Sequence, residues 1–215
     1  MSNILDVIAY AATLLVALLV HEFAHAFIAD RMGDRSAKNA GRLGFSLKPL
    51  IDPFGTLVLP GLLLLPILFG TLYVVPFAYA KPMPLNTWAL KGGEKMSWGV
   101  WLAGPLGNVI LAFIFGVAFR FAPATDLILR FIIAGLQVNV FMAAIHVVPL
   151  PPFDMSKIIV RVLPQGARDV YARMEQYGAL FVLVIFFVFS GPVLAFVRAI
   201  ANGICTLVAG GSCIG

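Results

Sequence analysis

His21, Glu22 and His25 form an HExxH pattern inside a long apolar stretch of the sequence. A spacing of four residues places both imidazoles on one face of a helix, where they can share one metal ion, typically zinc. Glu22 lies about a quarter-turn away and could act on water as a general base. The alternative is that these side chains pair with other helices and only hold a bundle together. Because unpartnered polar groups in apolar surroundings are costly, the pattern favours a metal site.

A catalytic zinc site needs a third protein ligand and an open position. Asp154 is the candidate, because Pro149-Leu150-Pro151-Pro152 would end the preceding helix and present the carboxylate rigidly. Its alternative is a carboxylate at a helix end or on the surface. His146 and Asn139, seven residues apart on nearly the same helix face, could line the site and donate hydrogen bonds to a carbonyl or its oxyanion. His146 could instead bind zinc itself, or be a satisfied buried histidine.

The amino-acid composition indicates that these residues belong to an integral membrane protein. The chain has 215 residues, 61% hydrophobic and 12% charged, with a mean hydropathy of +0.98. Soluble domains are about 45–50% apolar and about 25% charged, so a soluble fold is excluded. All three histidines fall in apolar segments, and ionisable groups inside a membrane are functional candidates by default. The net charge of +5 fits basic loops, and no soluble basic module for nucleic acid is present.

We expect an all-α polytopic membrane protein with about four or five transmembrane helices and one proline-broken re-entrant segment. The apolar segments are residues 3–29, 54–80, 98–121, 127–148 and 178–208, and residues 163–177 read as an amphipathic surface helix. The first segment is expected to be retained rather than cleaved as a signal peptide. Trp98 and Trp101 are expected at the membrane interface. The last segment is interrupted at Ser190-Gly191-Pro192, so it is either one kinked helix or two short ones.

The expected topology follows from the metal ligands. For HExxH and Asp154 to meet, segments 3–29 and 127–148 must run in the same direction, with 98–121 as the crossing between them. Segment 54–80, which contains Pro60, Pro66 and Pro76, then makes no net crossing and is re-entrant.

The basic residues support this arrangement. Loops 30–53, 81–97 and 151–176 hold five, three and four of the 15 basic residues, which predicts that all three loops are cytoplasmic. The site would then lie within the bilayer of the cell membrane, nearer its cytoplasmic side. We expect one membrane-embedded domain over residues 1–215, with a core of 3–154 followed by amphipathic and membrane helices in 155–215.

Several stretches together resemble the site-2 protease family of intramembrane zinc metalloproteases, in its minimal branch without PDZ or CBS domains. These stretches are HEFAHA, GRLGFSLKPLIDPFGTL, AKPMPLN, AGPLGN, NVFMAAIHVVPLPPFD and YARMEQYG. The resemblance covers nearly the whole chain. It implies that His21, His25 and Asp154 bind one Zn²⁺ and that Glu22 activates water. It also implies that the substrates are transmembrane proteins, cleaved within or near their spans in the lipid bilayer.

Two departures from the family's usual ending, FNLLPxPPLDG, bear on activity. His146 stands in place of the asparagine, and Met155 in place of the glycine after the aspartate. An imidazole can donate a similar hydrogen bond, but it can also bind zinc or misplace the carbonyl. One alternative is therefore a degenerate relative that binds membrane proteins without cleaving them, and another is a metal-ion transporter. The sequence predicts no oligomeric state.

Overall fold

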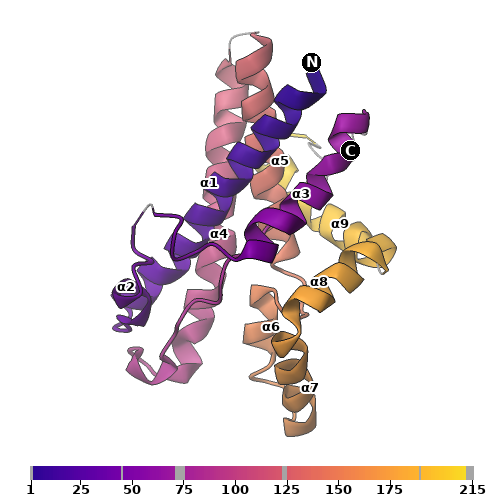
Figure 1. The fold of residues 1–215 in the computed structure, drawn as a ribbon. Coiled ribbons are helices and arrows are strands. Elements are labelled where there is room, and N and C mark those ends of the chain that lie inside the picture. Colours follow the sequence, from indigo (N-terminus) through magenta and orange to yellow (C-terminus); the bar gives the residue numbers. More distant parts are fainter. Residues whose placement is uncertain (1, 45, 71–75, 123–124, 189, 212–215) are drawn as a thin grey trace.

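The computed structural model describes residues 2–44, 46–70, 76–122, 125–188 and 190–211, and this part of the chain is mainly helical and contains no β-strand (Figure 1). The fold class expected from the sequence is confirmed. The α-helices are α1 (Ser2–Arg31), α2 (Ser36–Asn39), α3 (Leu59–Leu64), α4 (Ser97–Phe121), α5 (Asp126–Ile145), α6 (Asp154–Ile159), α7 (Gln165–Gln176), α8 (Gly178–Phe187) and α9 (Ser190–Ala209).

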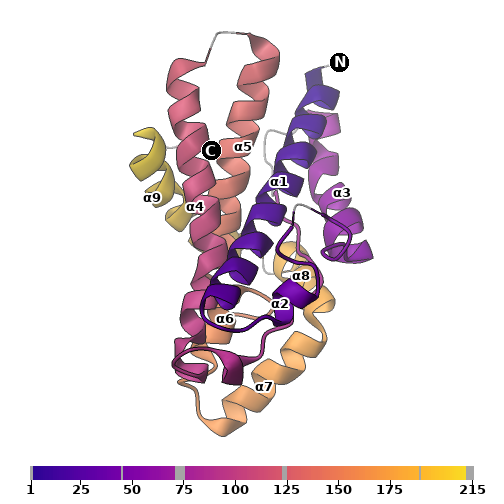
Figure 2. The ribbon, with the colours of Figure 1, turned by 90° about the vertical axis from the view of Figure 1, so that its left-hand side faces the viewer.

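Helices α1, α4 and α5 pack against one another and form the body of the molecule. α1 and α5 run in the same direction and α4 runs in the opposite one, as the metal ligands require (Figures 1 and 2). At their far end α1 and α5 are joined by an ion pair between Asp6 Oδ1 and Arg130 Nη1 at 2.5 Å and by a hydrogen bond from Tyr10 to Gln137. The two helices that lead to the metal ligands are therefore held together along their length.

Within the part of the chain that the structure describes, four helices are long and apolar enough to cross a membrane: Asn3–Arg31, Glu94–Phe121, Asp126–Ile145 and Gly191–Ala209. A fifth span would be α7 with α8, a pair bent by 88°. Large apolar side chains such as Ile8 on α1, Ile110 on α4 and Ile128 on α5 are exposed. An outer surface of this kind is suited to lipid, and the chain is a multi-pass membrane protein.

Residues 54–70 and 76–80, the described part of segment 54–80, begin and end at the same level of the bundle, as a re-entrant segment requires. The segment begins with Asp52, whose Oδ1 accepts hydrogen bonds from the N–H groups of Phe54 and Gly55. The helical run then continues through a π-turn segment (Pro53–Val58), α3 and a 3₁₀ segment (Leu65–Phe69), each with a proline in its first turn. These prolines divide the run without stopping it, because a missing N–H costs little at a first turn.

The run reaches the level of the start of α1, where Asn3 Nδ2 donates to Leu68 O at 3.3 Å. Residues 71–75 lie outside the described residues, and from residue 76 the chain is extended: Tyr79 N–H donates to Gly55 O at 3.1 Å and Lys81 N–H to Leu50 O at 3.0 Å. Both ends of the segment lie side by side, so its net crossing is zero. We call residues 76–86 the return strand, a name for extended backbone that forms no regular β-strand.

The C-terminal region differs from the expectation in detail. The amphipathic helix expected at 163–177 is α7, and segment 178–208 forms two helices, α8 and α9. α5 ends at Ile145, three residues before the expected end, and the short helix α6 was not expected at all. Residue 189, between α8 and α9, lies outside the described residues.

Candidate metal centre

His21, His25 and Asp154 meet inside the bundle. The Nε2 atoms of the two histidines are 3.0 Å apart, and Asp154 Oδ2 lies 3.1 Å from His21 Nε2 and 3.2 Å from His25 Nε2. All three residues are buried, with no more than 6% of their surface exposed. Among the described residues, these three form the group whose atoms could hold one metal ion.

Two elements bring these ligands together. α1 presents both imidazoles on one face, one helical turn apart. After α5 ends, the chain turns through residues 146–153 and places Asp154 at the first position of α6, beside the lower part of α1 (Figure 2). Phe153 is fully buried against Phe77 and the ring of His146, which anchors the residue before the ligand.

The protonation of both imidazoles is fixed by what their other nitrogens contact. His25 Nδ1 lies 2.7 Å from Val100 O, a carbonyl that can only accept. His21 Nδ1 lies 2.7 Å from Asn108 Oδ1, and Asn108 Nδ2 donates to Ala17 O and to Asn139 Oδ1. Each Nδ1 is therefore the donor, and in the neutral ring each Nε2 directs a lone pair into the centre.

The donor set fits a cation. Two imidazole lone pairs and a carboxylate oxygen converge within about 3 Å of one another, and acceptors repel one another unless a positive charge lies between them. Around a tetrahedral zinc with bonds of about 2.0–2.1 Å, ligand atoms lie about 3.3 Å apart. Two nitrogens and one carboxylate oxygen are a set that zinc commonly takes in catalytic sites.

Gly104 on α4 keeps space open beside these ligands. A Cβ atom at this position would lie 2.6 Å from His21 Nε2 and closer still to His25 Nε2. Small residues let helices approach closely, so glycines in a membrane helix such as those of the Ala103–Asn108 stretch ordinarily serve helix packing. Gly107 does so, since a Cβ there would be 3.2 Å from Ala24 Cβ of α1, but Gly104 faces the metal centre.

His146 contacts the third ligand. Its Nδ1 donates to Asp154 Oδ2 at 2.7 Å, while its Nε2 is buried and has no hydrogen-bond partner among the described residues. A neutral ring with its proton on Nδ1 has no proton on Nε2 to give to a carbonyl or oxyanion. Of the three roles left open by the sequence, this geometry agrees with a histidine that orients the carboxylate.

Asn139 does not line the site, contrary to the expectation. It is fully buried behind Asn108. Its Oδ1 accepts from Asn108 Nδ2 at 3.0 Å, and its Nδ2 donates to Gly135 O of its own helix at 2.8 Å. Seven residues separate it from His146, but Asn108 lies between its amide and the imidazole of His21. Asn108, whose expected role from the sequence was only a hydrogen bond across helices, makes that bond and also the contact with the ligand.

A cavity of about 310 Å³ opens beside the metal centre, and Glu22 lines it together with the ligands. Glu22 Oε2 is paired with Arg42 Nη1 at 3.0 Å, and the Arg42 side chain is only 4% exposed. From the sequence, Arg42 was one of the five basic residues of loop 30–53, and its contact with Glu22 was not expected. A charged residue in the GRLGF stretch that follows HExxH was the available signal.

Trp101 corrects another expectation. It is buried rather than placed at the interface, with its ring 5.7 Å from that of His25 and beneath Lys157 Nζ at 4.4 Å. Trp98, one turn earlier on α4, is 48% exposed and is suited to the membrane interface.

Comparison with known proteins agrees with this geometry. The chain is 33% identical over 184 residues to the "Putative zinc metalloprotease YwhC" of Bacillus subtilis, covering 81% of this chain and 78% of that protein. The chain belongs to the site-2 protease family. Within the family it is also 28% identical over 176 residues to the "Putative zinc metalloprotease Rip2" of Mycobacterium tuberculosis, of which it covers 64%.

A third relative, the "Putative zinc metalloprotease MJ0611" of Methanocaldococcus jannaschii, is 40% identical over 58 residues, which cover 27% of this chain and 30% of that protein. No family model and no solved structure matches the chain. The relatives and the helices together make the chain a membrane metalloprotease.

Proposed function

We propose that the protein is an intramembrane zinc endopeptidase that hydrolyses peptide bonds within or near the transmembrane segments of other membrane proteins. The observation that carries the proposal is the convergence of His21, His25 and Asp154 beside the Glu22-lined cavity in a multi-pass protein. Ionisable groups in an apolar interior are costly and mark functional sites, and here the two histidines and two carboxylates gather at one place.

The residues divide the chemistry among them. His21 Nε2, His25 Nε2 and Asp154 Oδ2 would hold the zinc, which supplies Lewis acidity that polarises a peptide carbonyl and acidifies water. Glu22 accepts the proton of the attacking water on its carboxylate and returns it to the leaving amine. Asn108 and Val100 O orient the imidazoles through Nδ1, and His146 orients Asp154.

The depth of the site fits a substrate in the bilayer. His21 lies eighteen residues after Asn3 on one helix, which is about 27 Å at about 1.5 Å per residue. The apolar layer is about 30 Å thick, so the site would lie inside it, near the side that holds the basic loops. By the positive-inside rule this side is cytoplasmic.

A transmembrane substrate must unwind before it is cut, because helical carbonyls are engaged. The return strand offers a place for the unwound chain. Tyr79 and Lys81 hydrogen-bond toward residues 50–56, so the backbone groups of Ala78 and Ala80 point the other way, toward the cavity that these alanines line. A substrate in extended form can pair with this free edge.

The first test is the metal content of the detergent-purified protein and of Asp154→Asn and Glu22→Gln variants. We expect about one zinc per chain in the unchanged protein and in Glu22→Gln, and less in Asp154→Asn. Reconstituted with single-span model substrates, the unchanged protein should cut and Glu22→Gln should not. Cleavage that survives in Glu22→Gln would overturn the assigned mechanism. Zinc binding and substrate capture that are the same in both, with no cleavage in either, would instead indicate the non-catalytic relative.

The pairing edge has its own test. Ala80→Pro removes the free N–H of Ala80 and should lower cleavage at least tenfold, while Ala80→Gly, which keeps the N–H, should cut nearly as well as the unchanged protein. Undiminished cleavage by Ala80→Pro would contradict the proposal that the substrate pairs with the return strand.

A further inference from the structure

Arg42 is a buried cation at the metal centre that binds no metal. Its Nη1 contacts Glu22 Oε2 at 3.0 Å, and its Nη2 donates to the carbonyls of Lys81 and Pro82 at 3.0 and 3.2 Å. One guanidinium therefore joins the expected general base to the return strand. Buried arginines are rare unless their donors are used in this way.

The loop after α1 is built to direct this side chain inward. Asp34, itself buried, accepts from Ser36 N–H at 2.9 Å with Oδ1 and from Asn86 N–H at 2.8 Å with Oδ2. The chain then turns at Gly41, whose φ of +76° favours glycine, and Arg42 N–H donates to Ala37 O at 3.0 Å. The turn that leads into the arginine is thereby fixed, and the return strand is bonded to this loop through Asn86 N–H and through the carbonyls of Lys81 and Pro82.

The free edge ends at Pro82. Ala78 and Ala80 keep their backbone groups on the cavity side, and the next residue on that side is Pro82, whose carbonyl accepts from Arg42 Nη2 at 3.2 Å. Pro82 and Pro84 also lack an N–H group. An extended substrate can pair as far as Ala80 and no farther, which sets its register on the strand.

The same guanidinium sets the position of the base. Arg42 holds Oε2 of Glu22, and no described group donates to Oε1, which leaves that oxygen to take up the proton of water. The Arg42 guanidinium thus holds both the end of the pairing edge and the general base in fixed positions. The peptide bond of the substrate that lies at the metal centre would therefore also lie within reach of Glu22.

We propose that Arg42 is a positioning residue that fixes the register of an extended substrate on the return strand relative to Glu22. This inference rests on the function proposed above. It requires arginine rather than lysine, because only a planar group with several fixed donors can bind a carboxylate and two carbonyls together. A lysine would keep the positive charge and lose this geometry.

The test uses two probes that bind zinc through the same group. Acetohydroxamate reaches only the metal, whereas a tripeptidyl hydroxamate also offers a backbone to the free edge. We compare their dissociation constants on the zinc-loaded full-length protein, on Arg42→Lys and on Arg35→Lys, an exposed arginine of the same loop as the matched control. Arg42→Lys should weaken the tripeptidyl probe about tenfold or more and change acetohydroxamate by less than about twofold, and Arg35→Lys should change neither.

The outcomes separate the possibilities. Equal weakening of both probes, or of neither, would overturn the positioning role. Arg42→Gln is measured in parallel, and loss of zinc from both Arg42 variants would make the residue purely structural and also overturn the proposal. An unchanged protein that binds zinc but neither probe would contradict the proposed function itself, as would one that binds no zinc.

Discussion

Asn108 shows how much of the metal centre depends on a residue that is not a ligand. Its amide spans three helices: Oδ1 meets His21 on α1, and Nδ2 reaches Ala17 O and Asn139 of α5. It fixes the tautomer of His21 and the direction of its lone pair. Partners of this kind tune a metal site almost as strongly as the ligands do.

Replacing Asn108 with alanine should lower the affinity for zinc about 10- to 100-fold, because His21 loses the acceptor that keeps its proton on Nδ1. Competition with a zinc-binding dye measures the affinity. Thr13→Ala is the control, since Thr13 is buried on α1 but bonds only to Ala9 O and Tyr10 O of its own helix. An affinity equal to that of the control would show that His21 is oriented by other means.

Gly104 allows an equally direct prediction at the residue scale. In Gly104→Ala the added methyl would meet both His Nε2 atoms, so zinc should fall from about one per chain to a small fraction. Gly99→Ala lies on the same helix and meets only Met32 Sδ at 3.9 Å, so it should keep its zinc. Elemental analysis of the purified proteins gives the answer, and full occupancy in Gly104→Ala would contradict the assigned site.

The elements differ in how far sequence could predict them. The lengths of their apolar stretches were enough to predict α1, α4 and α5. The shared direction of α1 and α5 could be predicted because the histidines of α1 and Asp154, which follows α5, must meet at one metal ion. Local pattern could not reveal which way a buried amide points, so Asn139 was chosen where Asn108 acts. It could not place Trp101 inside either, because that depends on the side of α4 that faces α1. Arg42 escaped notice because its partners are 20 and about 40 residues away in the chain.

The re-entrant hairpin, by which we mean segment 54–80, allows a prediction about its packing. Gly55 faces the ring of Tyr79 on the return strand, and a Cβ there would lie 2.6 Å from Tyr79 Cζ. Gly55→Ala should therefore push the strand away and destabilise the protein by about 1–3 kcal/mol. Gly61, in the same helical run, has open space around it, so Gly61→Ala is the control. Thermal unfolding in detergent compares them, and equal melting temperatures would refute the close packing of hairpin and strand.

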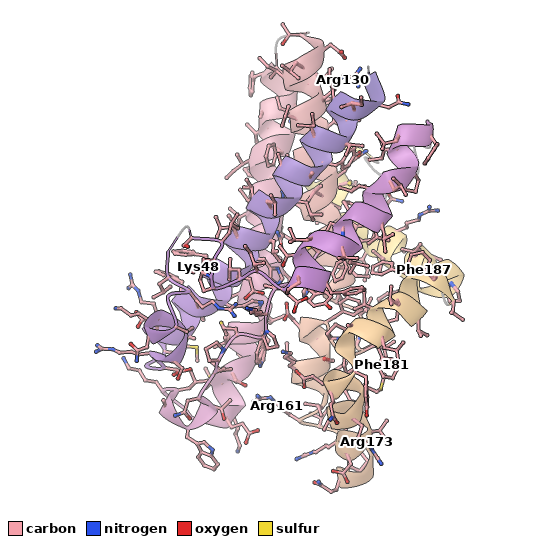
Figure 3. All side chains as sticks on the ribbon, in the orientation of Figure 1. Lys48, Arg130, Arg161, Arg173, Phe181 and Phe187 are labelled. Atoms are coloured by element: carbon pink, nitrogen blue, oxygen red, sulfur yellow. The ribbon has the colours of Figure 1, made fainter. Side chains whose placement is uncertain are left out.

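At the scale of the whole molecule, charge separates the two ends. Arg161 and Arg173 lie at the end that carries α6 and α7, and Arg130 lies at the opposite end with Asp6 and Asp126 (Figure 3). Arg130 is neutralised by its two carboxylates, which allows a basic residue to lie on the side poor in positive charge.

This polarity can be measured by adding cysteines at exposed positions. Lys48→Cys and Lys91→Cys flank the hairpin, and Asp126→Cys lies beyond α4. In sealed vesicles of one orientation, a membrane-impermeant thiol reagent should label the first two from one side and the third from the other, with the unsubstituted protein as the blank. Labelling of Lys48→Cys and Lys91→Cys from opposite sides would mean that the hairpin crosses the membrane after all.

The three acceptors that meet at the centre also bear on how the chain is made. His21 and His25 enter the membrane early in synthesis, and Asp154 arrives only after α5 has been inserted. Without a cation the last ligand meets repulsion, so zinc supply during biogenesis should govern how much chain matures. Cell-free synthesis into nanodiscs, with and without a zinc chelator, would show this as a difference in protease-resistant yield. Zinc starvation would then expose the unfinished protein to quality control, which makes its abundance a readout of the metal status of the cell.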